Sequence, residues 1–322
     1  MCTRLKCKLL GNVREFVSLE TNCNLEAGTT TLTLEKYWID AAHRFSEYFE
    51  GGIDGMKDRE IPWCASTTIT KPTNEDIKEA RHLPYRNLIG VLGFGVHLVK
   101  PECRIYLQTL QEHMNGWSRM LFKLALQLLE YCFYTREIGI MATADLDPHG
   151  ANILYAYADS NFSTPRSTGC SLTMLNGCPV AIRVKKHSTT DDSTMKAEIT
   201  EAFHASSDIV ALRNLMAEIR LYQEEPTILY QDNKPAIQVA ENKGALNKSS
   251  RALDIRVFTL RNRIEDQEVA LKWKDTLSLA ADIGTKFFSI KRFKFLRDLV
   301  NGYALARATG KTMLPSMVVT LV

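Results

Sequence analysis

The chain has 322 residues, of which 45% are hydrophobic and 24% charged, and its formal net charge is +3. These values are typical of globular proteins and exclude a disordered tail, while so small a net charge does not by itself indicate nucleic-acid binding. Eight cysteines without a C-x-x-C pair predict free thiols and an intracellular protein, cytoplasmic or nuclear. We expect no membrane role, because the most apolar run, Met120–Tyr134, carries charges and is too short to cross a bilayer.

The first half of the sequence predicts a small hairpin followed by helices. Two short strands, Leu9–Leu19 and Thr29–Leu34, flank a polar turn at Asn22–Gly28. Apolar residues at helical spacing then predict five helices: Glu35–Glu50, 75–81, 84–97, 103–115 and Arg119–Tyr134. We therefore expect a mainly helical segment behind a small N-terminal hairpin.

The second half predicts alternating strands and helices. Apolar runs bounded by turn residues predict five strands: Ile153–Ala158, Cys170–Leu175, Pro179–Lys185, Thr227–Tyr230 and Glu268–Trp273. The predicted helices are Ser193–Tyr222, Asn233–Asn242, Arg251–Glu265, Leu277–Lys286 and Ile290–Asn301. Asn176-Gly177 between two apolar runs is a strong hairpin signal. The expected fold is α/β, with a mixed five-stranded sheet and flanking helices.

Four carboxylates in this half occur at positions that can converge. Asp159 and Asp232 follow apolar strands, Glu198 lies early in a long helix, and Asp282 lies on a late helix. If the two strands are parallel neighbours, their carboxylates emerge at the same sheet edge. Like charges held together need a cation, and oxygen-rich sites prefer Mg²⁺ or Mn²⁺. Taken one by one, the same residues also suit a turn, a helix cap and a helix N-terminus.

Several short motifs in fixed order resemble one protein family. They are A-D-S-N at 158–161, P-R-S-T-G-C at 165–170, L-N-G-C-P-V at 175–180, S-T-M-K-A-E at 193–198, Y-Q-D-N-K-P-A-I at 230–237, L-D-I-R at 253–256 and L-A-A-D-I-G-T-K at 279–286. The segment from about Ala151 to Val300 resembles the ribonuclease H domain of copia-type retrotransposon Pol polyproteins. By this resemblance, residues 1–60 are the C-terminal remnant of a reverse transcriptase domain, 61–150 a helical connection segment, 151–303 a ribonuclease H-like domain and 304–322 a tail.

The resemblance implies hydrolysis of RNA in RNA–DNA hybrids with two Mg²⁺ ions, or Mn²⁺ in their place. Asp159 and Asp232 would hold both ions, Glu198 the ion near the leaving group, and Asp282 the ion on the nucleophile side. An upstream reverse transcriptase domain would be a partner within a polyprotein. The sequence departs from the family pattern at Lys196, where an acid is usual, and before L-D-I-R, where a histidine is absent. A catalytically inactive nucleic-acid-binding remnant of a transposon is therefore the alternative.

The N-terminal half lacks the paired aspartates of a polymerase site. Asp191-Asp192 is the only Asp-Asp pair in the sequence, and it precedes the Glu198 helix in a polar loop. We therefore expect no DNA polymerisation by this chain alone. Asp232 and Glu268 have the spacing of the acids in an integrase, but Glu268 begins a predicted strand, whereas the integrase acid lies on a helix.

A basic segment follows the third acidic motif. Its six predicted nucleic-acid-binding residues are Lys243, Lys248, Arg251, Arg256, Arg261 and Arg263. Such clusters bind phosphates and make affinity depend on salt, although a solvated basic helix face is an equal alternative. For Trp273, at the end of a predicted strand, burial in the core is favoured over base stacking.

Overall fold

The computed structural model describes residues 14–163, 165–188, 190–241 and 251–308. Its larger sheet has five strands in the order β7-β6-β5-β8-β9. Their bounds are Leu154–Asn161 for β5, Thr168–Leu175 for β6, Cys178–Lys186 for β7, Thr227–Gln231 for β8 and Val269–Trp273 for β9. The first three strands pair antiparallel, whereas β5, β8 and β9 are parallel. The predicted mixed five-stranded sheet is confirmed.

The turn between β6 and β7 is the hairpin that the sequence predicts. Asn176 and Gly177 both have positive φ, 52° and 77°. Two-residue hairpin turns of this kind match the right-handed twist of the strands, and asparagine and glycine tolerate the backbone best. The antiparallel register of β6 and β7 follows, with a shift between Thr173 and Met174.

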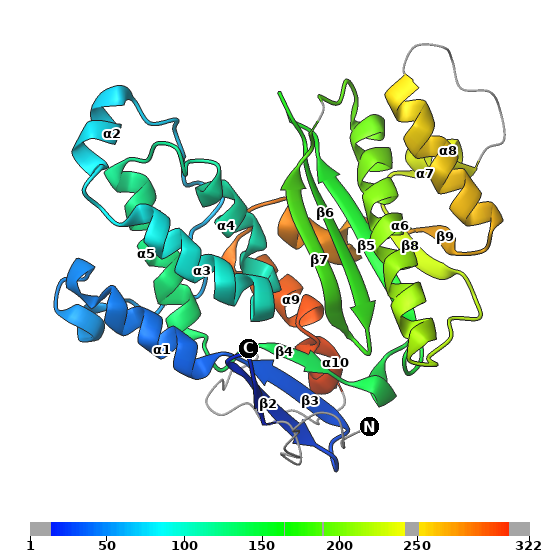
Figure 1. Ribbon diagram of the computed structural model, residues 1–322, viewed down its shortest axis with the longest axis horizontal. Coiled ribbons are helices and arrows are strands. Elements are labelled where there is room, and N and C mark those ends of the chain that lie inside the picture. Colours follow the sequence, from blue (N-terminus) through cyan, green and yellow to red (C-terminus); the bar gives the residue numbers. More distant parts are fainter. Residues whose placement is uncertain (1–13, 164, 189, 242–250, 309–322) are drawn as a thin grey trace, which may run out of the picture.

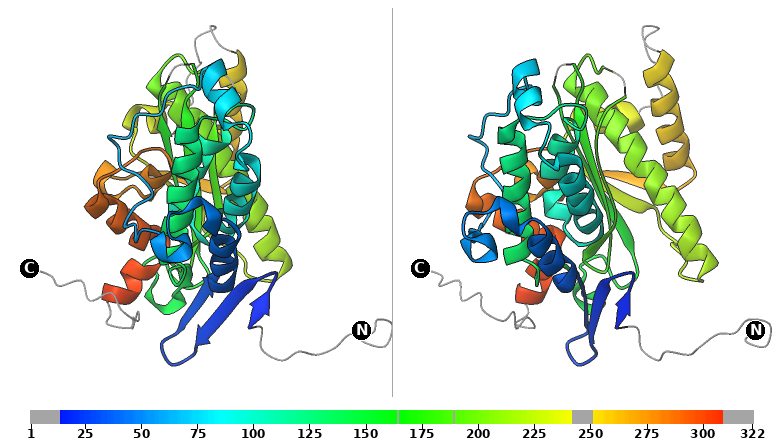
Figure 2. Two further views of the ribbon diagram at one scale, coloured as in Figure 1. Left: turned by 90° about the vertical axis from the view of Figure 1, so that its left-hand side faces the viewer. Right: turned by 60° about the vertical axis from the view of Figure 1, so that its left-hand side comes forward.

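Helices cover both faces of this sheet (Figures 1 and 2). On one face lie α6 (Thr194–Glu218), α7 (Lys234–Glu241) and α8 (Arg251–Glu265). Because strand residues alternate between faces, Ala156 and Ala158 of β5 pack with this helical layer, in a core that includes Ala202 of α6. Tyr155 and Tyr157 join the core on the opposite face.

The N-terminal half forms the helical layer on that opposite side. Its helices are α1 (Glu35–Arg44), α2 (Asn74–Ala80), α3 (Tyr85–Val99), α4 (Arg104–Gln111) and α5 (Arg119–Tyr134). The apolar core of this layer includes Phe293, which belongs to α9 (Ile290–Val300) near the other end of the chain. The two halves thus share a core, and the division into four segments stays a prediction.

A second, smaller sheet joins the first strands of the described chain to a short strand in the middle of the sequence. It pairs β1 (Glu15–Phe16), β2 (Leu19–Asn24), β3 (Thr29–Thr33) and β4 (Ile140–Ala142) in that order, all antiparallel. The first predicted strand, Leu9–Leu19, does not match a single strand of the structure, since β1 ends at Phe16 and β2 begins at Leu19. Residues 9–13 lie outside the described chain. The turn between β2 and β3 is shorter than the predicted turn, because β2 continues to Asn24, which pairs with Thr29.

Several predicted helix bounds are wrong for local reasons. The helix expected at 35–50 ends at Arg44 and gives way to short 3-10 turns. Helix α6 ends before Tyr222, because Arg220 adopts a left-handed backbone with φ of 64°. The helix expected at 277–286 is two 3-10 turns, η5 (Thr276–Ser278) and η6 (Ala280–Gly284), and the predicted tail begins within α10 (Tyr303–Ala308). None of the described helices combines the length and apolarity that a membrane crossing requires.

Candidate metal centre

The register of β5 against β8 brings Asp159 and Asp232 together. Tyr157 pairs with Tyr230 in parallel, so Asp159 and Asp232 occupy matching positions two residues further along each strand direction. Parallel strands present their C-terminal ends at one edge of a sheet, where α/β proteins build their sites. Asp159 is buried, and Asp232 is half-buried just beyond the end of β8. The predicted parallel pairing is therefore confirmed.

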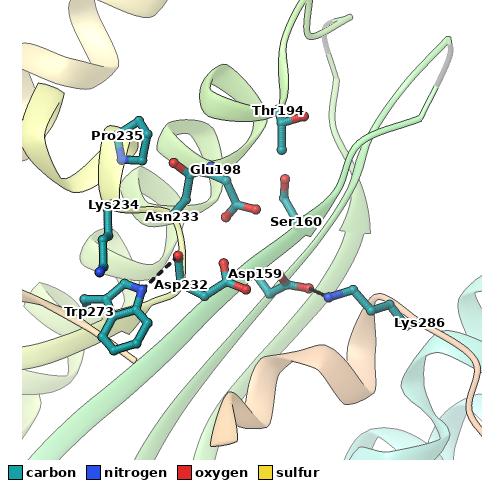
Figure 3. A pocket seen from close by; sticks show the side chains of 10 residues that line it. All are labelled: Asp159, Ser160, Thr194, Glu198, Asp232, Asn233, Lys234, Pro235, Trp273 and Lys286. Atoms are coloured by element: carbon teal, nitrogen blue, oxygen red, sulfur yellow. Dashed lines mark hydrogen bonds and ion pairs between the residues drawn. The ribbon is translucent and has the colours of Figure 1, made fainter. Parts of the chain in front are cut away.

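Glu198 reaches the same edge from the second turn of α6. A carboxylate oxygen from each of Asp159, Glu198 and Asp232 lies within 4.8 Å of the others. Figure 3 shows the three side chains pointing toward one another from two strands and a helix. Gln231 holds Glu198 in place, donating its side-chain N–H to the Glu198 Oε2 at 3.1 Å. We call these three acids the carboxylate trio.

Asp282 lies beside the trio but is engaged by basic side chains. It sits in η6 and is buried. Its Oδ1 is 2.5 Å from the Lys286 Nζ, and its Oδ2 is 3.9 Å from a guanidinium nitrogen of Arg292. Lys286 Nζ is also 3.5 Å from the Asp159 Oδ2. The structure thus places three of the four predicted acids together and separates the fourth from them by its own cations.

Crowding and burial raise the pKa of three acids of this site. Burial, followed by repulsion from Asp159 and Asp232, raises the pKa of Glu198 to about 9. Burial also raises the pKa of Asp159 to about 6, against the opposing effect of the Lys286 ammonium. The pKa of Asp282 is raised as well, again chiefly by burial. A divalent cation would remove this cost by neutralising the repulsion.

The trio fits a hard divalent cation. All three groups are carboxylates, which Mg²⁺ and Mn²⁺ prefer over nitrogen or sulfur ligands. Their separation of 4.8 Å or less allows oxygens to share one ion. Asp159, Glu198 and Asp232 are therefore the residues that would hold a metal, and the metal-binding role predicted for all four acids, Asp282 included, stays a prediction.

Metal binding should depend on pH because it displaces a proton. With a pKa of about 9, Glu198 is protonated at pH 7 in the metal-free protein and must lose that proton to ligate an ion. We expect Mg²⁺ affinity to rise with pH between about 6 and about 9, the raised pKa values of Asp159 and Glu198, and to level off above. Calorimetric titration in two buffers of different ionisation enthalpy counts the protons released. Glu198→Gln, which has no such proton, is the control, and binding without proton release at pH 7 would contradict the expectation.

No protein-family model matches the chain. The truncated transposon Ty1-A Gag-Pol polyprotein of Saccharomyces cerevisiae is 25% identical over 230 residues, which are 70% of this chain and 19% of that polyprotein. The transposon Ty1-LR2 Gag-Pol polyprotein of the same yeast is equally similar, with 13% of its length covered. This chain is a relative of copia-type retrotransposon Pol polyproteins. It spans less than a fifth of the length of these two relatives.

Two solved structures are similar to part of this Pol relative. LC11 ribonuclease H1 in complex with an RNA/DNA hybrid covers 40% of this chain and 91% of its own, at 9% identity and a TM-score of 0.32. The foamy viral protease-reverse transcriptase in complex with an RNA/DNA hybrid covers 63% of this chain and 27% of its own, at 12% identity and a TM-score of 0.33. The strand order and directions given above agree with the ribonuclease H-like fold expected from the sequence.

Three of the predicted nucleic-acid-binding arginines of the Pol relative fasten α8 to its neighbours. Arg256 and Arg263 donate to hydroxyl groups of α6, at 2.8 Å to Thr200 and 2.5 Å to Ser206. Arg261 is buried and donates to a backbone carbonyl of α7 at 2.7 Å. Packing of α8 therefore accounts for these arginines, and their contact with nucleic acid stays a prediction.

The other three basic residues cannot be placed in the same way. Lys243 and Lys248 lie outside the described residues. Arg251 is the first residue of α8, and its side chain is likewise outside what the structure describes. Their predicted role in nucleic-acid binding is unchanged.

Trp273 is not a core residue, contrary to the sequence-based expectation. It is 49% exposed and lies at the end of β9, beside Asp232. Its indole N–H donates to the Asp232 backbone carbonyl at 3.1 Å, and the Lys234 Nζ lies 4.4 Å from the ring centroid. The side chain points out because β9 ends there, at the rim of a pocket of about 510 Å³ that the trio, Lys234 and Lys286 also line (Figure 3).

Two polar residues after Asp282 were assigned no role from the sequence. The Thr285 hydroxyl donates to the Asp159 Oδ2, and Lys286 lies between Asp159 and Asp282. Both belong to the motif L-A-A-D-I-G-T-K, in which they follow Asp282 by three and four residues. Hydroxyl and ammonium groups directly behind a predicted metal ligand are the signal that could have identified them.

Proposed function

We propose that this Pol relative carries a metal-dependent ribonuclease H that hydrolyses the RNA strand of RNA–DNA hybrids. The observation that supports it best is the convergence of Asp159, Glu198 and Asp232 within 4.8 Å at the C-terminal ends of two parallel strands. The proposal also rests on the order of the motifs and on the similarity to Ty1 polyproteins.

In this proposal, each side chain around the pocket has a distinct task. The trio holds divalent ions, and Gln231 orients Glu198 through its hydrogen bond. Thr285 orients the Asp159 carboxylate in the same way. When bound, two divalent ions supply an activated water and neutralise the charge that develops on the transferring phosphate.

The pocket rim supplies groups suited to a nucleic-acid strand. Lys234 is exposed, and its ammonium can pair with a backbone phosphate. The Trp273 ring, fixed by its hydrogen bond to the Asp232 carbonyl, offers a flat apolar surface to a sugar or base. Both groups lie next to the trio, so they would contact the strand close to the cleaved phosphodiester.

The departure from the family pattern at Lys196 leaves the trio intact. Lys196 forms an ion pair with Asp192, four residues earlier and outside the trio. The lysine at this position therefore gives no reason to prefer the alternative, an inactive remnant that only binds nucleic acid.

A cleavage assay distinguishes the two functions. The purified chain is incubated with a hybrid labelled on its RNA strand, with Mg²⁺ or Mn²⁺ and in parallel with EDTA. RNA–RNA and DNA–DNA duplexes of the same sequence are the matched substrates. We expect metal-dependent cleavage of the RNA strand of the hybrid alone. Binding of the hybrid without cleavage in either metal would overturn the ribonuclease and favour the remnant.

A further inference from the structure

Lys286 places a positive charge between two buried carboxylates of the candidate metal centre. Its Nζ lies 2.5 Å from the Asp282 Oδ1 and 3.5 Å from the Asp159 Oδ2 (Figure 3 shows the contact with Asp159). Asp159 and Asp282 each retain only 3% side-chain exposure, so little water reaches these oxygens. The ammonium is therefore their nearest described source of positive charge.

The position of this ammonium matters for how many ions the site can take. An ion held by the trio has its ligands ready within 4.8 Å of one another. A second ion, held between Asp159 and Asp282, would need the oxygens that Lys286 now contacts. Two cations cannot share these oxygens without strong repulsion. The second position is thus closed while Lys286 stays in place.

A count of formal charges leads to the same conclusion. Once Glu198 has lost its proton, the four carboxylates and the two basic side chains that contact them, Lys286 and Arg292, carry a formal charge of −2. One divalent cation neutralises this charge. A second would leave the protein site positive until an anion, such as a phosphate group, arrives. Electrostatic balance therefore favours one ion in the protein alone.

Lys286 can nevertheless leave its position. Its side chain is 36% exposed, and its four-carbon stem allows the ammonium to move into water while the backbone stays fixed. Arg292, 24% exposed, would remain near Asp282 at 3.9 Å. A nearby phosphate offers the ammonium an alternative partner of the same charge as the carboxylates.

We propose that Lys286 is a built-in counter-cation that occupies the place of the second divalent ion. The protein alone then binds one ion tightly, and the second enters when Lys286 is displaced, as by a phosphate of a bound strand. The proposal rests on the metal-binding part of the proposed function, and it makes Lys286 a residue that couples ion loading to substrate binding.

Counting Mn²⁺ by the paramagnetic resonance signal of the free ion tests this proposal without nucleic acid. In the unmodified protein we expect one tight site and a second that is weaker by at least about tenfold, roughly the effect of one competing charge-assisted contact. Lys286→Met should bind two ions, with the second site strengthened by at least about tenfold. Lys291→Met, which removes an exposed lysine of α9, is the matched control and should behave as the unmodified protein.

Three results would overturn the proposal. These are a Lys286→Met titration that superimposes on that of the unmodified protein, two equally tight sites in the unmodified protein, or the same change in Lys291→Met. Circular dichroism checks that the variants are folded, and Lys286→Gln repeats the count if the methionine variant is not. Because no hybrid is present, the number of bound Mn²⁺ ions is measured independently of cleavage. A protein that binds Mn²⁺ as expected but does not cleave the hybrid would refute only the proposed ribonuclease activity.

Discussion

Replacing Asp232 by asparagine is expected to lower the rate of hybrid cleavage by about a thousandfold or more while the fold is kept. Asp232 supplies one of the three carboxylates that lie within 4.8 Å of one another. An amide keeps its shape but not the charge that holds a divalent ion. The rate is measured on the labelled hybrid at saturating Mg²⁺.

The same variant should be at least as stable as the unmodified protein when metal is absent. Asp232 contributes to the repulsion that raises the pKa of Glu198, so its neutralisation relieves the trio. Thermal unfolding with and without Mg²⁺ should show that the stabilisation by metal is lost. Asp266→Asn, at an exposed carboxylate just after α8, is the control for both measurements. Cleavage by Asp232→Asn within tenfold of the normal rate would contradict the role given to the trio.

Replacing Glu102 by alanine is expected to destabilise the protein by about 3–5 kcal/mol, the usual cost of removing one partner of a buried ion pair. Glu102 and Lys100 are fully buried, and their charged groups are 3.9 Å apart. The Glu102 carboxylate also accepts hydrogen bonds at 3.1 Å from Tyr131 of α5 and from Asn301, which follows α9. Its loss leaves the Lys100 ammonium buried without its counter-charge. The free energy of unfolding is measured by urea denaturation.

The matched control is a second glutamate that also joins the two halves of the chain. Glu112 forms an ion pair with Lys186 of β7 at 2.6 Å, but both side chains are partly exposed, at 29% and 41%. Surface pairs contribute about 0–1 kcal/mol, so Glu112→Ala should have a small effect. Equal destabilisation by the two variants would show that burial of the Glu102 network does not matter.

Those parts of the fold that depend on local patterns could be predicted from the sequence. Helices α5 and α8 have the predicted bounds, and α5 starts after Ser118, whose side chain accepts from the Leu121 N–H. The three-residue strand β4 could not be predicted, since nothing local marks it. It forms because β3, more than a hundred residues earlier, offers it a free edge.

In the candidate site, too, the features that depend on local patterns could be predicted, and those that depend on distant contacts could not. Asp159 and Asp232 could be placed together because each lies close to the end of a strand and the two strands are parallel. The pairing of Asp282 with Lys286, four residues apart, is one that the expected helix would also allow. The contact of Lys286 with Asp159 could not be foreseen, because it depends on how this segment packs against β5. The exposure of Trp273 likewise follows from where β9 ends at the sheet edge, which its apolar character does not reveal.

Contacts with the last helices determine when the N-terminal half can finish folding during synthesis. The Gly139 N–H donates to the Tyr303 hydroxyl, a residue 164 positions later. At a translation rate of about 5–20 residues per second, these two groups leave the ribosome on the order of 10 s apart. For that interval the edge of β4 and the surface that receives Phe293 remain open to water. The N-terminal half therefore cannot complete its core until the last helices have been made.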